Sequence, residues 1–130
     1  MQDLLEIVRA DFAKNHIGRE YDLHVAEQGF TDYARLGLPF VVSGLVIIFV
    51  TPKTDGVVEF HCMNKGDGKD LSAAVIGFLK DAAAAYETAV TYYDNPRVSN
   101  LMKFSQVPVT VTKIDAGLDK TYEARFTLRS

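Results

Sequence analysis

The sequence contains a single cysteine, Cys62, among its 130 residues. No disulfide can therefore form within the chain, and a zinc site built from several cysteines is excluded. Cys62 lies in a segment with the composition of a β-strand. We predict that it is a small buried hydrophobe and not a catalytic thiol.

The sequence also lacks an apolar run long enough to cross a bilayer. The longest run, Phe40 to Val50, is broken by a Ser-Gly pair and predicts buried strands. Three carboxylates, Asp3, Glu6 and Asp11, interrupt the first twelve residues, which therefore do not resemble a secretory signal. We expect no membrane partner and a cytoplasmic location.

Positive charge is not in excess, since 14 Lys and Arg stand against 17 Asp and Glu, a net charge of −3. Nucleic-acid binding needs a clustered basic surface that displaces counterions, so we expect no nucleic-acid partner. The composition, 48% hydrophobic and 24% charged, is that of a folded globular protein. The length suits one domain, residues 1–130, around one core.

Hydrophobic spacing predicts an α/β chain of the mixed, α+β kind. Residues 3–14 have the period of a helix, whereas residues 19–38 show no clear period and fit a short helix plus loop. The remaining predicted elements are a hairpin turning at Ser43-Gly44 (38–52), a strand (57–63), a long helix starting near Lys69, a strand (87–94), a short helix (95–106) and two final strands (107–114 and 120–130).

A loop with two glycines, Gly66 and Gly68, joins the predicted strand 57–63 to the long helix. Glycines let backbone amides approach a ligand, and the helix start adds free N–H groups and a positive dipole end, so the loop suits phosphate oxygens. Lys65 and Lys69 would add countercharge, whereas Asp67 would oppose an anion. The alternative is a simple turn without a ligand.

Two sharper ligand motifs are excluded by position. A nucleotide P-loop would need a glycine at Met63 and a hydroxyl at Asp70. A calcium loop starting at Asn64 would need a glutamate where Val75 stands.

The succession of hairpin, strand, glycine loop, long helix, strand, short helix and final hairpin over residues 38–130 resembles the GNAT family of acyl-CoA-dependent N-acetyltransferases. The family's loop motif is Arg or Gln, two free positions, Gly, a free position, and Gly or Ala. Gly66 and Gly68 match its glycines, and Met63 stands at its first position. The resemblance implies a mostly antiparallel central sheet flanked by helices, and acetyl-CoA as cofactor. It also implies that the loop holds the coenzyme's pyrophosphate, through Met63, Asn64, Lys65, Gly66, Asp67, Gly68 and Lys69.

A later motif of the family is an Asn followed seven residues on by a Tyr in a short apolar helix. Asn95, Val98 and Leu101 match it, and the resemblance places Asn95 with the cofactor-binding residues. Met102 stands at the tyrosine position, so the general acid that often protonates the departing thiolate is missing. A similar departure occurs in GNAT-like proteins carried in the virions of short-tailed bacteriophages.

Candidate catalytic residues lie on the predicted strand 57–63. Alternation places Glu59 and His61 on one face as neighbours, and in the resembled fold this strand borders the acceptor cleft. A carboxylate or imidazole there can take a proton from an attacking amine. The alternative is two solvated polar side chains. Tyr92 and Tyr93 follow on the next strand, where one of them is expected in the core.

Two functions remain open. The first is an acetyl-CoA-binding protein that transfers the acetyl group to a small-molecule or protein amine. The alternative is a non-catalytic structural or interaction protein, such as a phage virion component whose partners are other virion proteins. No metal site is predicted, and a homo-oligomer is left open.

Overall fold

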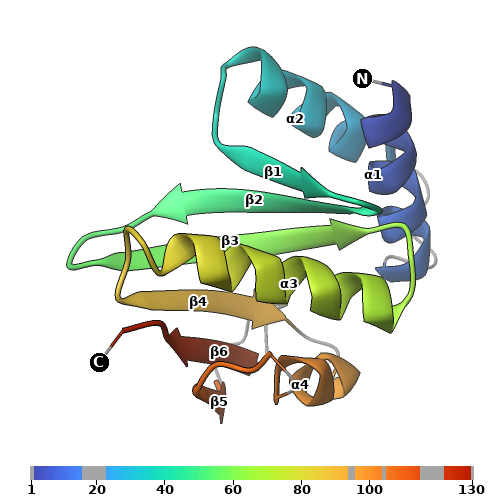
Figure 1. Ribbon diagram of the computed structural model, residues 1–130. Coiled ribbons are helices and arrows are strands. Elements are labelled where there is room, and N and C mark those ends of the chain that lie inside the picture. Colours follow the sequence, from blue (N-terminus) through green and yellow to red (C-terminus); the bar gives the residue numbers. More distant parts are fainter. Residues whose placement is uncertain (1, 16–22, 94–95, 104, 115–121, 130) are drawn as a thin grey trace. The chain divides into compact units, whose positions relative to one another are not determined.

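The computed structural model describes residues 2–15, 23–93, 96–103, 105–114 and 122–129 (Figure 1). Within these residues the chain forms four helices and one six-stranded sheet, in strand order β1-β2-β3-β4-β6-β5. The elements are α1 (Gln2–Asn15), α2 (Leu23–Arg35), β1 (Phe40–Ser43), β2 (Val46–Pro52), β3 (Val57–Asn64), α3 (Gly68–Ala82), β4 (Thr88–Tyr93), α4 (Pro96–Lys103), β5 (Val109–Lys113) and β6 (Tyr122–Thr127).

The α+β prediction is confirmed. Strand β1 pairs with β2, β4 with β6, and β5 with β6 in antiparallel fashion, whereas β3 and β4 are parallel. A parallel pair needs a crossover connection, and α3 supplies it. The long helix, predicted to start near Lys69, begins one residue earlier, at Gly68.

Helix α2 is the element that the sequence indicated least clearly. It ends in a Schellman motif: the amide of Gly37 donates to Ala34 O, and the amide of Leu38 donates to Tyr33 O. Gly37 adopts a φ of 71°, which costs glycine little. The sequence therefore indicated where α2 ends, although its apolar spacing did not indicate the helix itself.

The two hairpin turns follow the residues that favour them. Asp55 and Gly56 both have positive φ, and Val57 N donates to Thr54 O, as in a type I′ turn. In the first hairpin Ser43 pairs with Val46, so the turn consists of Gly44 and the residue after it. The predicted Ser43-Gly44 turn was therefore one residue too early.

The chain divides into two compact units. Unit 1 comprises residues 1–49 and 62–71, and unit 2 comprises residues 50–61 and 72–130. The division runs through β2, β3 and α3, so each unit takes one part of these elements.

Unit 1 packs α1 and α2 onto the β1–β2 hairpin. Its core consists of Ile7, Val8, Phe30 and Ile47. The Phe30 ring meets the rings of Phe40 and Phe49 edge to face, with centroids 5.6 and 5.9 Å apart. Helix α2 thereby gains a fixed position on the hairpin within this unit.

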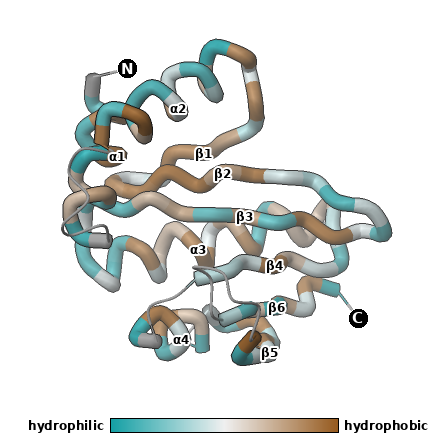
Figure 2. Tube along the Cα trace, turned by 180° about the vertical axis from the view of Figure 1, so that it is seen from behind, coloured by the Kyte–Doolittle hydropathy of each residue, from teal (hydrophilic) through white to brown (hydrophobic). Residues whose placement is uncertain are grey.

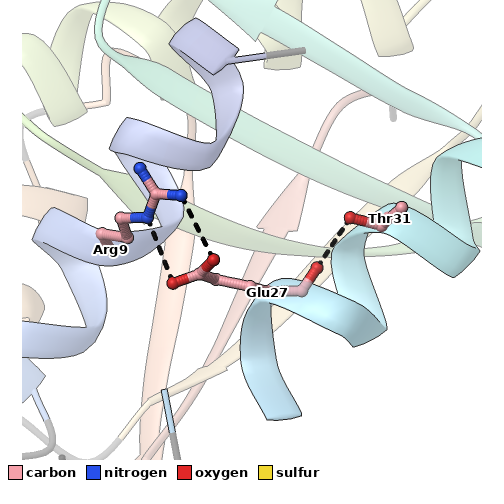
Figure 3. A network of polar contacts seen from close by, with 3 residues as sticks. All are labelled: Arg9, Glu27 and Thr31. Carbon is pink, nitrogen blue, oxygen red and sulfur yellow. Dashed lines mark hydrogen bonds and ion pairs between the residues drawn. The ribbon is translucent and has the colours of Figure 1, made fainter. Parts of the chain in front are cut away.

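A charged fork joins the two helices of unit 1 (Figure 3). Arg9 donates from Nε and Nη2 to the two carboxylate oxygens of Glu27, at 3.1 and 3.2 Å. These hydrogen bonds lower the pKa of Glu27 and raise that of Arg9. One turn further on, Thr31 Oγ1 donates to the Glu27 carbonyl oxygen.

Unit 2 has an aromatic core between its strands and α3, which lies over one face of the sheet in Figure 1. The Phe60 ring lies 5.0 Å from that of Phe78 and 6.0 Å from that of Phe126, between centroids, and Phe60 and Phe126 are fully buried. Strand register explains this arrangement, because Val58 is opposite Ala89 and Ala89 is opposite Phe126. The alternate residues of these strands are left for the other face of the sheet.

Candidate functional site

The predicted catalytic pair lies on the sheet face of unit 2 that faces away from Phe60. His61 Nε2 is 2.8 Å from Glu59 Oε2, so the predicted contact between these two side chains is present. The His61 side chain is 38% exposed and that of Glu59 21% exposed. A solute can therefore reach the imidazole, while the carboxylate lies deeper.

Three further side chains, those of Tyr92, Glu123 and Arg125, extend this face. The sequence alone did not predict that they would lie together. Register places Tyr92 opposite Glu123 and Val90 opposite both Glu59 and Arg125. Arg125 Nε is 3.4 Å from Glu123 Oε1. We call Glu59, His61, Tyr92, Glu123 and Arg125 the sheet-face cluster.

Burial and neighbouring charges act on the phenol of Tyr92. Desolvation raises its pKa, as do the negative charge of Glu123, a hydrogen bond to that carboxylate, and the charge of Glu59. The phenol therefore stays protonated and can donate. The other tyrosine of the pair, Tyr93, is buried and bonds through its hydroxyl to Ser99 Oγ at 2.8 Å, so the expectation of one core tyrosine is confirmed.

The cluster has the groups for proton transfer. With a proton on Nε2, the imidazole of His61 donates to Glu59, which orients the ring and leaves Nδ1 as an acceptor. Such an acceptor can take a proton from an amine. Alternation of Glu123 and Arg125 along the last strand was visible in the sequence, but its pairing with β4 was not.

The glycine loop, in unit 1, is organised by a carboxylate from within it. Asp67 Oδ1 accepts hydrogen bonds from the amides of Lys69 and Asp70, at 3.0 and 3.2 Å. Asp70 Oδ2 in turn accepts from the Asp67 amide at 2.9 Å. This is a reciprocal cap of helix α3, and the hydrogen bonds lower the pKa of Asp67. The sequence carried the signal, an Asp followed three residues later by another.

Gly66 is required by this cap. A Cβ added at Gly66 would lie 2.2 Å from Asp70 Oδ2, so a larger residue would displace the capping carboxylate. The Gly66 amide donates to Asn64 Oδ1 at 2.8 Å, and Asn64 Nδ2 donates to the Asp67 carbonyl oxygen at 3.0 Å. Close packing inside the loop therefore accounts for the glycine at this position without a ligand.

Helix α1 holds the loop from outside. Lys65 Nζ is 3.0 Å from Glu6 Oε2, and Lys14 Nζ donates to the Gly66 carbonyl oxygen at 2.6 Å. The Asn64 amide donates to Asp11 Oδ1 at 3.0 Å. Lys65, which we expected to provide countercharge to an anion, is thus paired within unit 1.

These contacts bear directly on the phosphate prediction. The amides of residues 66, 67, 69 and 70 already donate to side chains of the loop. Two carboxylates, Asp67 and Asp70, occupy the helix start where a pyrophosphate would lie, and their charge repels an anion. Four backbone amides in the loop and at the start of α3 are therefore satisfied by side chains of the loop itself.

The remaining predicted cofactor residues are less informative. Met63 packs against the core of unit 1, and Asn95 lies outside the described residues. Met102, at the position of the family's tyrosine, is buried. A tyrosine placed there would have to find room in the core.

Cys62 is partly buried, so the prediction of a small buried side chain is met only in part. Desolvation, with a contribution from the negative charge of Asp11, raises the thiol pKa to about 12. A protonated thiol is a poor nucleophile, which agrees with the prediction that Cys62 is not catalytic.

No protein-family model, curated protein or solved structure matches the chain. Among the residues that the structure describes, no helix has the length and apolarity to span a bilayer. The same residues contain no cluster of three or more His, Cys, Asp or Glu side chains that could hold a metal ion.

Proposed function

We propose that the chain is a non-catalytic interaction protein built on a fold that resembles that of acetyltransferases. The partners we propose are proteins, such as the other components of a phage virion, as the resemblance to virion proteins suggests. This function requires neither a coenzyme site nor a general acid.

The observation that carries the proposal is the reciprocal cap between Asp67 and Asp70. A coenzyme pyrophosphate would have to displace both carboxylates from the amides and would then lie beside their negative charges. This cost would weaken the backbone-amide contacts that hold coenzyme A in the resembled family. The satisfaction of these amides by side chains of the loop therefore favours a structural role.

Calorimetric titration with coenzyme A and acetyl-CoA tests this proposal. We expect no binding heat at millimolar ligand, which corresponds to an affinity weaker than about 4 kcal/mol. Two variants provide the contrast: Gly68→Val changes the loop, and Gly77→Val makes the same change in α3 where nothing lies within 4 Å. One-to-one binding that Gly68→Val abolishes and Gly77→Val preserves would overturn the proposal.

A second candidate, acetyl transfer to an amine, is favoured by the sheet-face cluster alone. The 2.8 Å contact between Glu59 and His61 supplies an oriented base, and proximity of two reactants can accelerate a reaction by several kcal/mol without an acid. Turnover would be slow, because the buried Met102 thioether donates no proton.

Release of free thiol from acetyl-CoA in the presence of an amine panel measures this activity. If the second candidate is right, Glu59→Gln lowers the rate at least about tenfold. Glu87→Gln makes the same change on a residue of unit 2 outside the cluster and leaves the rate unaltered. Equal rates for the two variants would remove Glu59 from the mechanism.

A further inference from the structure

We propose that β1 is an interaction edge, at which two copies of the chain pair their β1 strands antiparallel about a twofold axis through Val41. The inference extends the proposed function, since it names one partner.

The position of β1 leaves backbone groups available. It is the terminal strand in the sheet order, with β2 as its one neighbour there. In a hairpin closed by a two-residue turn, hydrogen-bonded and non-hydrogen-bonded pairs alternate, starting with a bonded pair at Ser43 and Val46. Phe40 and Val42 therefore direct their N–H and C=O groups away from β2, toward the open edge.

Apolar side chains on both faces of this edge are exposed. Val41 and Val42 point to opposite faces of the sheet, yet they are 46% and 44% exposed. Leu36, Leu38 and Leu45, beside the strand, are exposed too. Figure 2 shows β1 and the adjoining start of β2 in brown. An added strand would cover both valines at once.

The edge has little protection against pairing. Charged side chains, especially lysine, commonly guard an edge strand. No charged residue occurs from Leu36 to Pro52, and Pro39, just before the strand, is the main device that limits the edge. The pairing is therefore confined to the four residues of β1.

The absence of charge favours a second copy as the occupant. An isologous contact sets each residue near its own equivalent, so any charge close to the axis would meet a like charge. The edge has none, although the chain carries a net charge of −3. A partner recognised by charge would find no complementary group on it.

The register follows from the available backbone groups. Phe40 of one copy exchanges two hydrogen bonds with Val42 of the other, and the symmetric pair does the same. Val41 then faces Val41 of the second copy in a non-hydrogen-bonded pair, where β-branched side chains pack closely. Four hydrogen bonds over so short a strand suit a weak, concentration-dependent dimer.

Sedimentation over roughly 1 µM to 1 mM protein tests the pairing. We expect a monomer–dimer equilibrium that Val41→Lys abolishes, because it places two ammonium groups at the axis. Val25→Lys is the matched control: the same change at an exposed valine of α2 leaves the dimer intact. Circular dichroism verifies that both variants fold. A monomer throughout, or a dimer that survives Val41→Lys, overturns the proposal.

A cysteine pair tests the register. Oxidised Val41→Cys is expected to cross-link two copies at high concentration, whereas Val42→Cys, which faces Phe40 of the other copy, cross-links much less. The reverse preference would reject the register. Coenzyme titration separates this inference from the proposed function. A monomer that binds no coenzyme would refute the dimer alone. A dimer that binds coenzyme would refute the non-catalytic role alone.

Discussion

Units 1 and 2 differ in how far their large apolar side chains are exposed to solvent. The exposed large hydrophobic residues of the described chain all belong to unit 1: Val25, Leu36, Leu38, Val41, Val42 and Leu45. In unit 2 the Phe60 ring of β3 contacts Phe78 of α3 and Phe126 of β6, and the opposite face of the sheet carries the polar sheet-face cluster. Unit 2 thus places the phenylalanine rings and the charged side chains of β3 and β6 on opposite faces, although the buried Val90 of β4 lies on the polar face. By contrast, β1 of unit 1 exposes apolar groups on both faces.

The difference shows where each unit can interact. Large exposed apolar areas typically mark contacts with other molecules, because keeping apolar surface in contact with water costs free energy. Unit 1 offers such an area at a sheet edge, whereas unit 2 offers titratable groups on a sheet face. An interaction role therefore draws mainly on unit 1, and any chemistry draws on unit 2.

The largest expected effect is on the core of unit 2. Phe60→Ala removes a fully buried ring that contacts two others, so we expect the free energy of unfolding to fall by about 3–5 kcal/mol. Val41→Ala, at the exposed edge of unit 1, should cost less than about 1 kcal/mol in dilute protein. Urea denaturation measures both. Similar costs for the two variants would contradict this difference between the two units.

Thiol reactivity provides a second contrast, inside unit 1. With a pKa near 12, the Cys62 thiol is ionised to roughly 1 part in 10⁴ at pH 8, so alkylation should be about 1,000-fold slower than for a free cysteine. The introduced thiol of Val41→Cys, on the exposed edge, should react at the ordinary rate. Mass spectrometry of the alkylated peptides distinguishes the two sites, and equal labelling would contradict the raised pKa of the Cys62 thiol.

Substitutions in the glycine loop should lower the free energy of unfolding by less, and combining two of them tests their coupling. Asp70→Ala should lower the free energy of unfolding by about 1 kcal/mol through loss of the cap, and Gly66→Ala by a similar amount because its Cβ displaces the same carboxylate. Because Asp70→Ala keeps the Cβ of residue 70, which lies 2.9 Å from a Cβ added at residue 66, the double variant should cost more than either single variant but less than their sum. Fully additive costs would mean that Gly66 serves some purpose other than accommodating Asp70.

The smallest expected effect concerns the fork between α1 and α2. The folded state lowers the pKa of Glu27, so this contribution to stability is complete above the unfolded pKa of about 4.3 and is lost as pH falls through the folded value. Glu27→Gln should lower the melting temperature by about 2 °C or less at pH 7 and leave it unchanged near pH 2. A difference that persists at pH 2 would assign the effect to packing. Thr31, which bonds to the backbone of Glu27, is undisturbed by the change.

Local signals in the sequence accounted for most elements. The Asp55-Gly56 turn, the start of α3 and the alternation along β6 depend on backbone preferences of adjacent residues, which a sequence displays directly. The contact between Glu59 and His61 was predictable for the same reason, since residues two apart on a strand share a face. Only α2 lacked a clear period.

The meaning of the glycine loop was decided by tertiary contacts. Two glycines before a helix suit a phosphate and suit a tight cap equally well, and the sequence alone could not choose between them. Glu6, Asp11 and Lys14 reach the loop from more than 50 positions away, and the sheet-face cluster likewise required β4 to pair with β6. Which amides remain free for a ligand depends on side chains that only folding brings within hydrogen-bonding distance.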